Sequence, residues 1–284
     1  MFVVLEAKKI IKKCFFYFFV FFCILYVAKT FQPKSKTVLA DAYPKSYVAI
    51  VIDDFGYNGE GTDDMIALDV PFTAAVMPFS SNSQENVEKL QSAGKEMIIH
   101  MPMESLTGKK EWVGDKAVFT SMSDEEIKQC VEQAISIVKG ATGINNHMGS
   151  AIMENERCFS AVMDVIAQRG LIFVDSMTTA GSVGDAVCHK KGVSILKRDI
   201  FLDSTDDVNV VKKQLMQTAE VAKEKGYAIG IGHVGPEGGN ITVAAIKELA
   251  PVLEQQGIVF VTVSQLQEIL LSKQNNWCDK KGKW

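Results

Sequence analysis

The sequence predicts an α/β protein built as a barrel, closed or distorted, of about seven parallel strands. Short apolar runs rich in β-branched residues recur along the chain, as in strands buried on both faces of a parallel sheet. Segments of helical periodicity alternate with these runs, and the connections between them are short. Seven or eight such units favour a barrel over an open, doubly wound sheet.

The first 30 residues are expected to be a signal peptide or a membrane anchor. Lysines at positions 8, 9, 12 and 13 precede an uncharged, phenylalanine-rich run from Cys14 to Ala28, the order of a basic region and an apolar region in a targeting segment. The protein is therefore expected to be extracytoplasmic, either periplasmic or on the cell surface, and attached to the membrane if the segment is retained. Residues 31–46 are predicted to be a linker, 47–272 the barrel domain, and 273–284 a polar tail.

Composition excludes several function classes. The formal net charge is −4 at pH 7, so the composition does not suggest a nucleic-acid-binding protein, and no nucleic-acid partner is expected. The motif G-x-G-x-x-G follows no predicted strand, and we therefore expect no nucleotide cofactor. The cysteines of the exported part show no C-x-x-C spacing that would indicate a metal site.

The first predicted strand, Val48 to Ile52, runs directly into two carboxylates, Asp53 and Asp54, and then Gly56. In barrels and open α/β sheets, catalytic groups collect at the carboxyl ends of the strands. Successive strand residues point to opposite faces, so a bend after Ile52 is needed to bring both carboxylates to one site.

The remaining elements follow from apolar periodicity and from glycine stop signals. One helix has a capping box, with Ser123 as the N-cap and Glu126 three residues on. Further strands are expected over 72–76, 97–99, 171–174, 193–196, 228–231 and 258–263, with a strand or loop over 143–150. Helices are expected over 82–93, from 124 to about 139, and over 156–168, 205–225, 240–255 and 264–271.

Polar residues at the ends of these strands predict a metal site. His100, His147 and His233 each lie at or beside a predicted strand end, as does Asp175. In a barrel these ends share one face, and histidine with aspartate suits a divalent metal, with zinc as the default. His189, beside two lysines, is expected to lie on the surface.

This geometry favours metal-assisted hydrolysis. A divalent cation allows both neighbouring aspartates to stay ionised. One can bind the metal while the other accepts a proton from the attacking water, and a histidine can protonate the leaving group. Hydrolysis of an acyl bond and hydrolysis of a phosphoester both remain open on this evidence.

Five stretches resemble the divergent polysaccharide deacetylase family, a distant branch of the metal-dependent carbohydrate deacetylases. They are IDDFG at 52–56, GKEMIIHMPME at 94–104, GINNHMGS at 143–150, FVDSMTT at 173–179 and IGIGHVGPEGG at 229–239. The resemblance covers nearly all of the exported part. It implies a distorted (β/α) barrel and an extracytoplasmic location.

The resemblance also implies roles for individual residues. Asp53 would be the catalytic base and Asp54 a metal ligand, with His100 as a further ligand and His233 as the catalytic acid. Glu104 stands where the family has a second histidine, and His147 can complete the site instead. Glu104, Asn146, Asp175 and Ser176 are expected on the substrate side. The family's arginine-bearing third motif has no clear match.

We therefore expect an exported, metal-dependent hydrolase acting on an acylated carbohydrate, most simply by N-deacetylation of a polysaccharide. One alternative is a non-catalytic envelope protein that uses a deacetylase-like barrel to bind glycan or a protein partner. A second alternative is a metal-dependent phosphoesterase.

Overall fold

The computed structural model describes residues 45–205, 207–236 and 238–281. These belong to a compact unit that begins at Lys45. The expected targeting segment, and the expected linker up to residue 44, lie outside the described residues. Within the described part, none of the helices combines the length and apolar character needed to cross a membrane.

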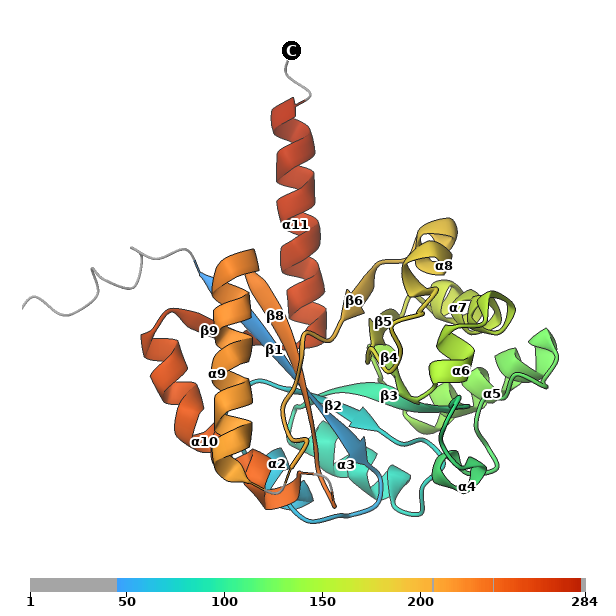
Figure 1. Cartoon of the computed structure of the whole chain (residues 1–284), viewed down its shortest axis with the longest axis horizontal. Coiled ribbons are helices and arrows are strands. Elements are labelled where there is room, and N and C mark those ends of the chain that lie inside the picture. Colours follow the sequence, from blue (N-terminus) through green and yellow to red (C-terminus); the bar gives the residue numbers. More distant parts are fainter. Residues whose placement is uncertain (1–44, 206, 237, 282–284) are drawn as a thin grey trace, which may run out of the picture. The chain divides into compact units, whose positions relative to one another are not determined.

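Among the described residues, nine strands form one sheet in which all pairings are parallel. The order is β6-β5-β4-β3-β2-β1-β8-β7, and β9 pairs with the first half of β1. The sheet curls into an incomplete barrel (Figure 1), which confirms the predicted fold class. The strands are β1 (Ser46–Phe55), β2 (Thr73–Val76), β3 (Glu96–Met103), β4 (Gly143–Met148), β5 (Ile172–Asp175), β6 (Ile195–Lys197), β7 (Ile200–Phe201), β8 (Tyr227–His233) and β9 (Ile258–Val261).

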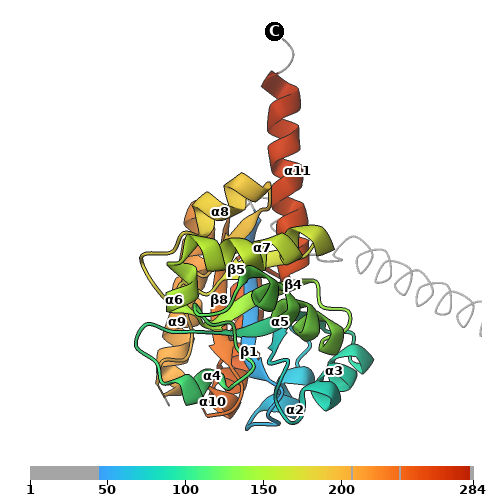
Figure 2. The same cartoon turned by 90° about the vertical axis from the view of Figure 1, so that its right-hand side faces the viewer.

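Most helices connect the strands and pack on the outside of the curled sheet (Figure 2), whereas the last helix follows the final strand and its first turns cover the inner core. The helix α9 packs against α10 and over β1 and β8, while α5 packs against α7 and β3. The helices are α2 (Thr62–Ile66), α3 (Ser83–Ser92), α4 (Lys110–Val113), α5 (Asp124–Ile137), α6 (Ser150–Met153), α7 (Glu156–Arg169), α8 (Gly184–Lys191), α9 (Val208–Lys225), α10 (Gly239–Gln255) and α11 (Val263–Lys281). The capping box of Ser123 and Glu126 is present at the start of α5, as predicted.

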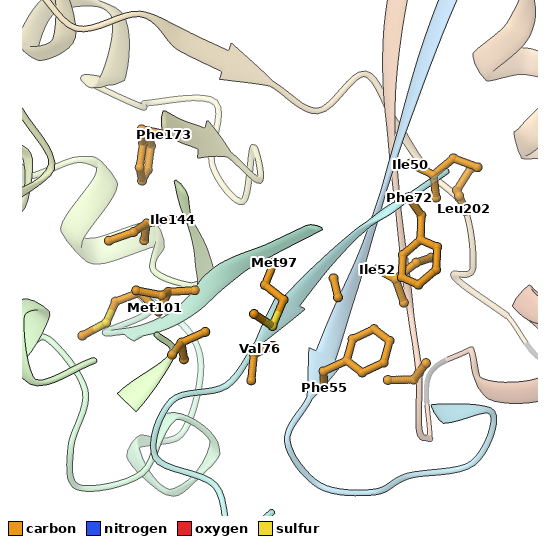
Figure 3. Close-up of a cluster of buried hydrophobic side chains, with 14 of the residues drawn as sticks. Ile50, Ile52, Phe55, Phe72, Val76, Met97, Met101, Ile144, Phe173 and Leu202 are labelled. Atoms are coloured by element: carbon orange, nitrogen blue, oxygen red, sulfur yellow. The ribbon is translucent and has the colours of Figure 1, made fainter. Parts of the chain in front are cut away.

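Both faces of the sheet are buried, as the continuous apolar strands predicted. Val48, Ile50 and Ile52 belong to the larger core on the helix side, part of which Figure 3 shows. Ala49 and Val51 belong to a second, smaller core on the inner face. Its other members come from most of the remaining strands and from the first turns of α11, and they include Val174, Ile229, Ile231, Val263 and Leu266.

Several boundaries differ from the predicted ones. The strand β3 continues to Met103, so His100 lies inside it rather than at its end. The two-residue strand β7 and the helix α8 were not predicted. The last helix was expected to end near Leu271, but α11 continues to Lys281 because no glycine or proline interrupts the sequence up to that point.

Candidate functional site

The site lies on the inner face of the sheet, directly beyond the inner apolar core. Along β1, Asp53 follows Ala49 and Val51 at the same two-residue spacing, and along β8, His233 follows Ile229 and Ile231. Asp53 and His233 are partners in the register of these strands. His100 of β3 and Asn145 of β4 are likewise partners. The parallel register therefore brings these four buried polar side chains together.

Asp54 reaches the same face through a bulge in β1. Ile52 pairs with Ala74 and Phe55 pairs with Val76, so three steps along β1 match two along β2. Asp54 occupies the left-handed region, with φ of 67°, a conformation that aspartate tolerates better than most residues. Gly56 has φ of 122°, and its N–H donates to Oδ1 of Asn86 at 2.9 Å. The extra residue turns the carboxylates of Asp53 and Asp54 toward one site, and it provides the bend that was expected after Ile52.

Asp54, His100 and His147 form a compact group of potential metal ligands. Nε2 of His100 lies 3.1 Å from Nδ1 of His147 and 3.6 Å from Oδ1 of Asp54. Nδ1 of His147 lies 3.7 Å from the same Oδ1. Ligand atoms around a tetrahedral zinc ion are about 3.4 Å apart, given bonds of about 2.1 Å. Oδ1 of Asp54 is buried without a hydrogen-bond partner. The three residues therefore fit a divalent cation.

Asp53 and His100 are linked through the side chain of Asn145. Nδ2 of Asn145 donates to Oδ1 of Asp53 at 2.8 Å, and Nδ1 of His100 lies 2.8 Å from Oδ1 of Asn145. Burial raises the pKa of Asp53 to about 6 despite the opposing effects of His233 and Asn145. Burial and the neighbouring His147 lower the pKa of His100 to about 3. His100 is thus a neutral ligand at pH 7, while Asp53 can exchange a proton near neutrality.

His233 is held by Asp203, a residue that the sequence analysis did not single out. Nδ1 of His233 lies 2.9 Å from Oδ1 of Asp203, while Oδ2 accepts from the backbone N–H of His233 at 2.6 Å and from Oγ1 of Thr242 at 2.7 Å. Burial alone would lower the pKa of His233, but the hydrogen bond to Asp203 and the charge of Asp53 raise it to about 9. His233 is therefore protonated at pH 7, as a general acid must be.

Gly238 allows the start of α10 to approach this pair. A Cβ atom at position 238 would lie 2.1 Å from Oδ2 of Asp203 and 2.6 Å from Oγ1 of Thr242. The glycine-rich stretch after His233 thus packs closely onto the histidine–aspartate pair.

Arg198 is a second residue that the sequence analysis missed. Its guanidinium group donates to the backbone carbonyls of Ser176 at 2.7 Å and Met177 at 3.0 Å. It lies 4.9 Å from the ring centre of Phe201, and that ring is 4.9 Å from the ring of His233. Arg198 and Asp203 flank the two-residue strand β7, which is too short to give a strand signal. The apolar run Ile200-Phe201-Leu202 before Asp203 was the available clue.

The residues expected on the substrate side have other partners in the structure. The carboxylate of Glu104 accepts from the backbone N–H and Oγ1 of Thr120, both at 2.6 Å. Among the described residues, the group of potential metal ligands contains His147 and not Glu104. Asp175 is buried and accepts from the N–H of Met177 and from Oγ of Ser182.

Asn146 and Ser176, the other two residues expected on the substrate side, form hydrogen bonds between the ends of β4 and β5. Asn146 accepts from the N–H of Ser176 at 2.9 Å and donates to the carbonyl of Met148 at 2.7 Å. Oγ of Ser176 accepts a 3.3 Å hydrogen bond from Asn145. Their direct contact with substrate stays a prediction.

Comparisons with known proteins agree with this geometry. The family model described as "Divergent polysaccharide deacetylase" matches residues 50–267. The uncharacterized protein YibQ of Escherichia coli (strain K12) is 31% identical over 204 residues, which span 72% of this chain and 63% of that protein. An uncharacterized protein of Haemophilus influenzae (strain ATCC 51907 / DSM 11121 / KW20 / Rd) is 30% identical over 217 residues, or 76% of this chain and 77% of its own length.

Solved structures share the fold, and one of them aligns over most of its length. The crystal structure of the uncharacterized protein ATU2773 from Agrobacterium tumefaciens C58 aligns with a TM-score of 0.72 at 22% sequence identity. The alignment covers 79% of this chain and 90% of that one.

Proposed function

Because the chain belongs to the divergent polysaccharide deacetylase family, we propose that it is an exported, metal-dependent hydrolase that removes an acyl group from a carbohydrate, most simply by N-deacetylation. The observation that carries the proposal is the placement of a base and an acid beside one ligand group. Oδ2 of Asp53, the proposed base, lies 3.5 Å from Nε2 of His100. His233, the proposed acid, lies opposite Asp53 in the register of β1 and β8.

The protein groups divide the proton transfers of amide hydrolysis between them. Asp53 accepts a proton from the water that attacks the acyl carbon, and Asn145 holds this carboxylate in place. The carbon–nitrogen bond then breaks, and His233 donates its proton to the departing amine while Asp203 holds the imidazolium. The products are a carboxylic acid and a free amino sugar. Asp54, His100 and His147 would hold the metal, most simply zinc, which when bound supplies Lewis-acid polarisation of the carbonyl and activation of water.

An open hollow lies beyond the ends of β3 and β4. It has a volume of about 720 Å³ and is lined in part by Glu104, Leu106, Glu154 and Arg157. Glu104 directly follows β3, the strand that carries His100. We propose that sugars flanking the reacting unit lie along this hollow.

The test is acetate release by the full-length chain, supplied with one equivalent of zinc, from N-acetylated and O-acetylated oligosaccharides, with p-nitrophenyl phosphate as a comparison substrate. We expect acetate from at least one glycan and none after chelation. Asp53→Asn should keep zinc and lose about 100- to 10,000-fold in turnover, whereas Asp54→Asn should lose zinc as well. Glycan binding without acetate release would instead favour the binding protein, and phosphate release the phosphoesterase.

A further inference from the structure

Asn145 occupies the centre of the site without being a ligand, a base or an acid. It is fully buried in β4, opposite His100 in the strand register. Its side chain contacts groups from three other strands or strand ends, namely Asp53 of β1, His100 of β3 and Ser176 after β5.

The hydrogen bonds of this amide admit one arrangement. The amide atom that faces Asp53 is Nδ2, and an amide nitrogen can only donate. Oδ1 of Asn145 then faces His100 and can only accept, so the proton of the neutral imidazole must be on Nδ1. The lone pair of His100 is consequently on Nε2, the atom that faces Asp54 and His147.

We infer that Asn145 is a positioning residue that fixes two partners at once: the carboxylate of Asp53 and the ligand tautomer of His100. One amide thereby sets the relative position of base and metal site. Groups that orient a metal-bound histidine commonly change metal affinity about 10- to 100-fold when removed. The effect on Asp53 rests on the proposed function, whereas the effect on His100 concerns metal binding alone.

Two substitutions separate these effects. In Asn145→Asp, one carboxylate oxygen still accepts from Nδ1 of His100, while the oxygen that replaces Nδ2 repels Asp53, so that the two carboxylates hold a proton between them. In Asn145→Ala, both contacts are lost. Asn209→Asp makes the same chemical change at an exposed position in the first turn of α9. Asn209 belongs neither to the proposed ligand group nor to the lining of the hollow, and the variant serves as the control.

The experiment uses the full-length chain and measures the zinc dissociation constant, kcat and KM on the best glycan, and the melting temperature of the zinc-free protein. We expect Asn145→Asp to bind zinc within about tenfold of wild type and to lose about 100-fold or more in kcat with little change in KM. Asn145→Ala should bind zinc about 10- to 100-fold more weakly. Asn209→Asp should match wild type in zinc affinity and kcat.

Two results would overturn the inference. One is loss of zinc by Asn145→Asp as severe as that of Asn145→Ala, and the other is wild-type turnover by zinc-loaded Asn145→Asp. If wild type hydrolyses no glycan, the proposed function fails, and the zinc series alone decides: weak binding by Asn145→Ala with retained binding by Asn145→Asp supports the role, and any other order refutes it.

Discussion

At the scale of single residues, Asp203 shows how one buried carboxylate sets the protonation state of the proposed acid. Its two oxygens accept from the ring and the backbone N–H of His233 and from Thr242. A neutral imidazole in so buried a place would be useless as an acid at neutral pH, because burial lowers its pKa. The carboxylate reverses that effect and keeps the proton available.

This leads to a prediction for the pH dependence of turnover. The base works only when ionised and the acid only when protonated, so activity is expected between the pKa of Asp53, about 6, and the pKa of His233, about 9. Activity is lost as the pH rises through the pKa of His233. In Asp203→Asn the raised pKa loses its main support, so the alkaline limb of kcat/KM should move to lower pH. Thr242→Val, which leaves the contact between Asp203 and Nδ1 of His233 intact, should keep the limb near 9. An alkaline limb that stays in place in Asp203→Asn would show that Asp203 does not set this pKa.

The residues predicted from sequence were those at the ends of well-formed strands. Asp53, Asp54 and His100 follow or belong to apolar runs long enough to be recognised, whereas His147 was recognised from its place in the stretch 143–150. The parallel register and the bulge in β1 bring these residues together. Glu104 matches the family's second histidine by its spacing from His100. Four residues along a strand, however, separate the two residues by about 13 Å, and the carboxylate of Glu104 accepts hydrogen bonds from Thr120 instead. Asp203 escaped notice because β7 is only two residues long.

At the scale of elements, Glu96 ties the start of α11 to two strands. Its carboxylate accepts from Oγ1 of Thr73 at 2.8 Å and from Oγ1 of Thr262 at 2.9 Å. It also accepts from the N–H of Ser264 at 3.2 Å and from the hydroxyl of the same residue. These bonds fix α11 where it covers the inner core. The last helix was expected to begin at Ser264, but α11 begins one residue earlier, at Val263.

We predict that Glu96→Ala lowers the free energy of unfolding by about 2–4 kcal/mol, since several hydrogen bonds to one charged group are lost and their donors are left in a partly buried place. Denaturant unfolding measures the change. Glu88→Ala on α3 removes a carboxylate that is exposed and bonds to Gln84, and should change stability by less than about 0.5 kcal/mol. Similar losses in both variants would contradict a specific role for Glu96.

At the scale of the whole molecule, the proposed metal would connect β1, β3 and β4 while leaving β2, which lies between β1 and β3, without a ligand. A ligand that binds only the folded state stabilises it by mass action. Metal binding is therefore expected to raise the stability of the entire barrel and not of one strand alone.

Zinc at about 100 times its dissociation constant should stabilise the fold by about 2.7 kcal/mol, which corresponds to a rise in melting temperature of about 5–10 °C for a domain of this size. Calorimetry with and without a chelator measures it. The double variant His100→Ala, His147→Ala should melt at the same temperature in both conditions. A zinc-dependent rise that persists in the double variant would place the ion elsewhere.

The break between the phenylalanine-rich segment and the barrel pattern predicts that a chain beginning at Ala42 folds by itself, since the compact unit begins at Lys45. It should be soluble and show one cooperative thermal transition. Aggregation, or a transition without cooperativity, would mean that the preceding segment is part of the fold.

Within two residues of their ends, three strands of the site have a non-glycine residue in the left-handed region, which limits how the protein can change over evolutionary time. Asp54, Met148 and Met177 all have positive φ although none is glycine, at a cost of about 1–3 kcal/mol each. Glycine would relieve this strain at all three positions, but at 54 it would also remove a proposed ligand. Lineages under selection for heat resistance alone should therefore accumulate glycine at all three, whereas lineages that retain the chemistry should keep the strained aspartate and relax only the two methionines.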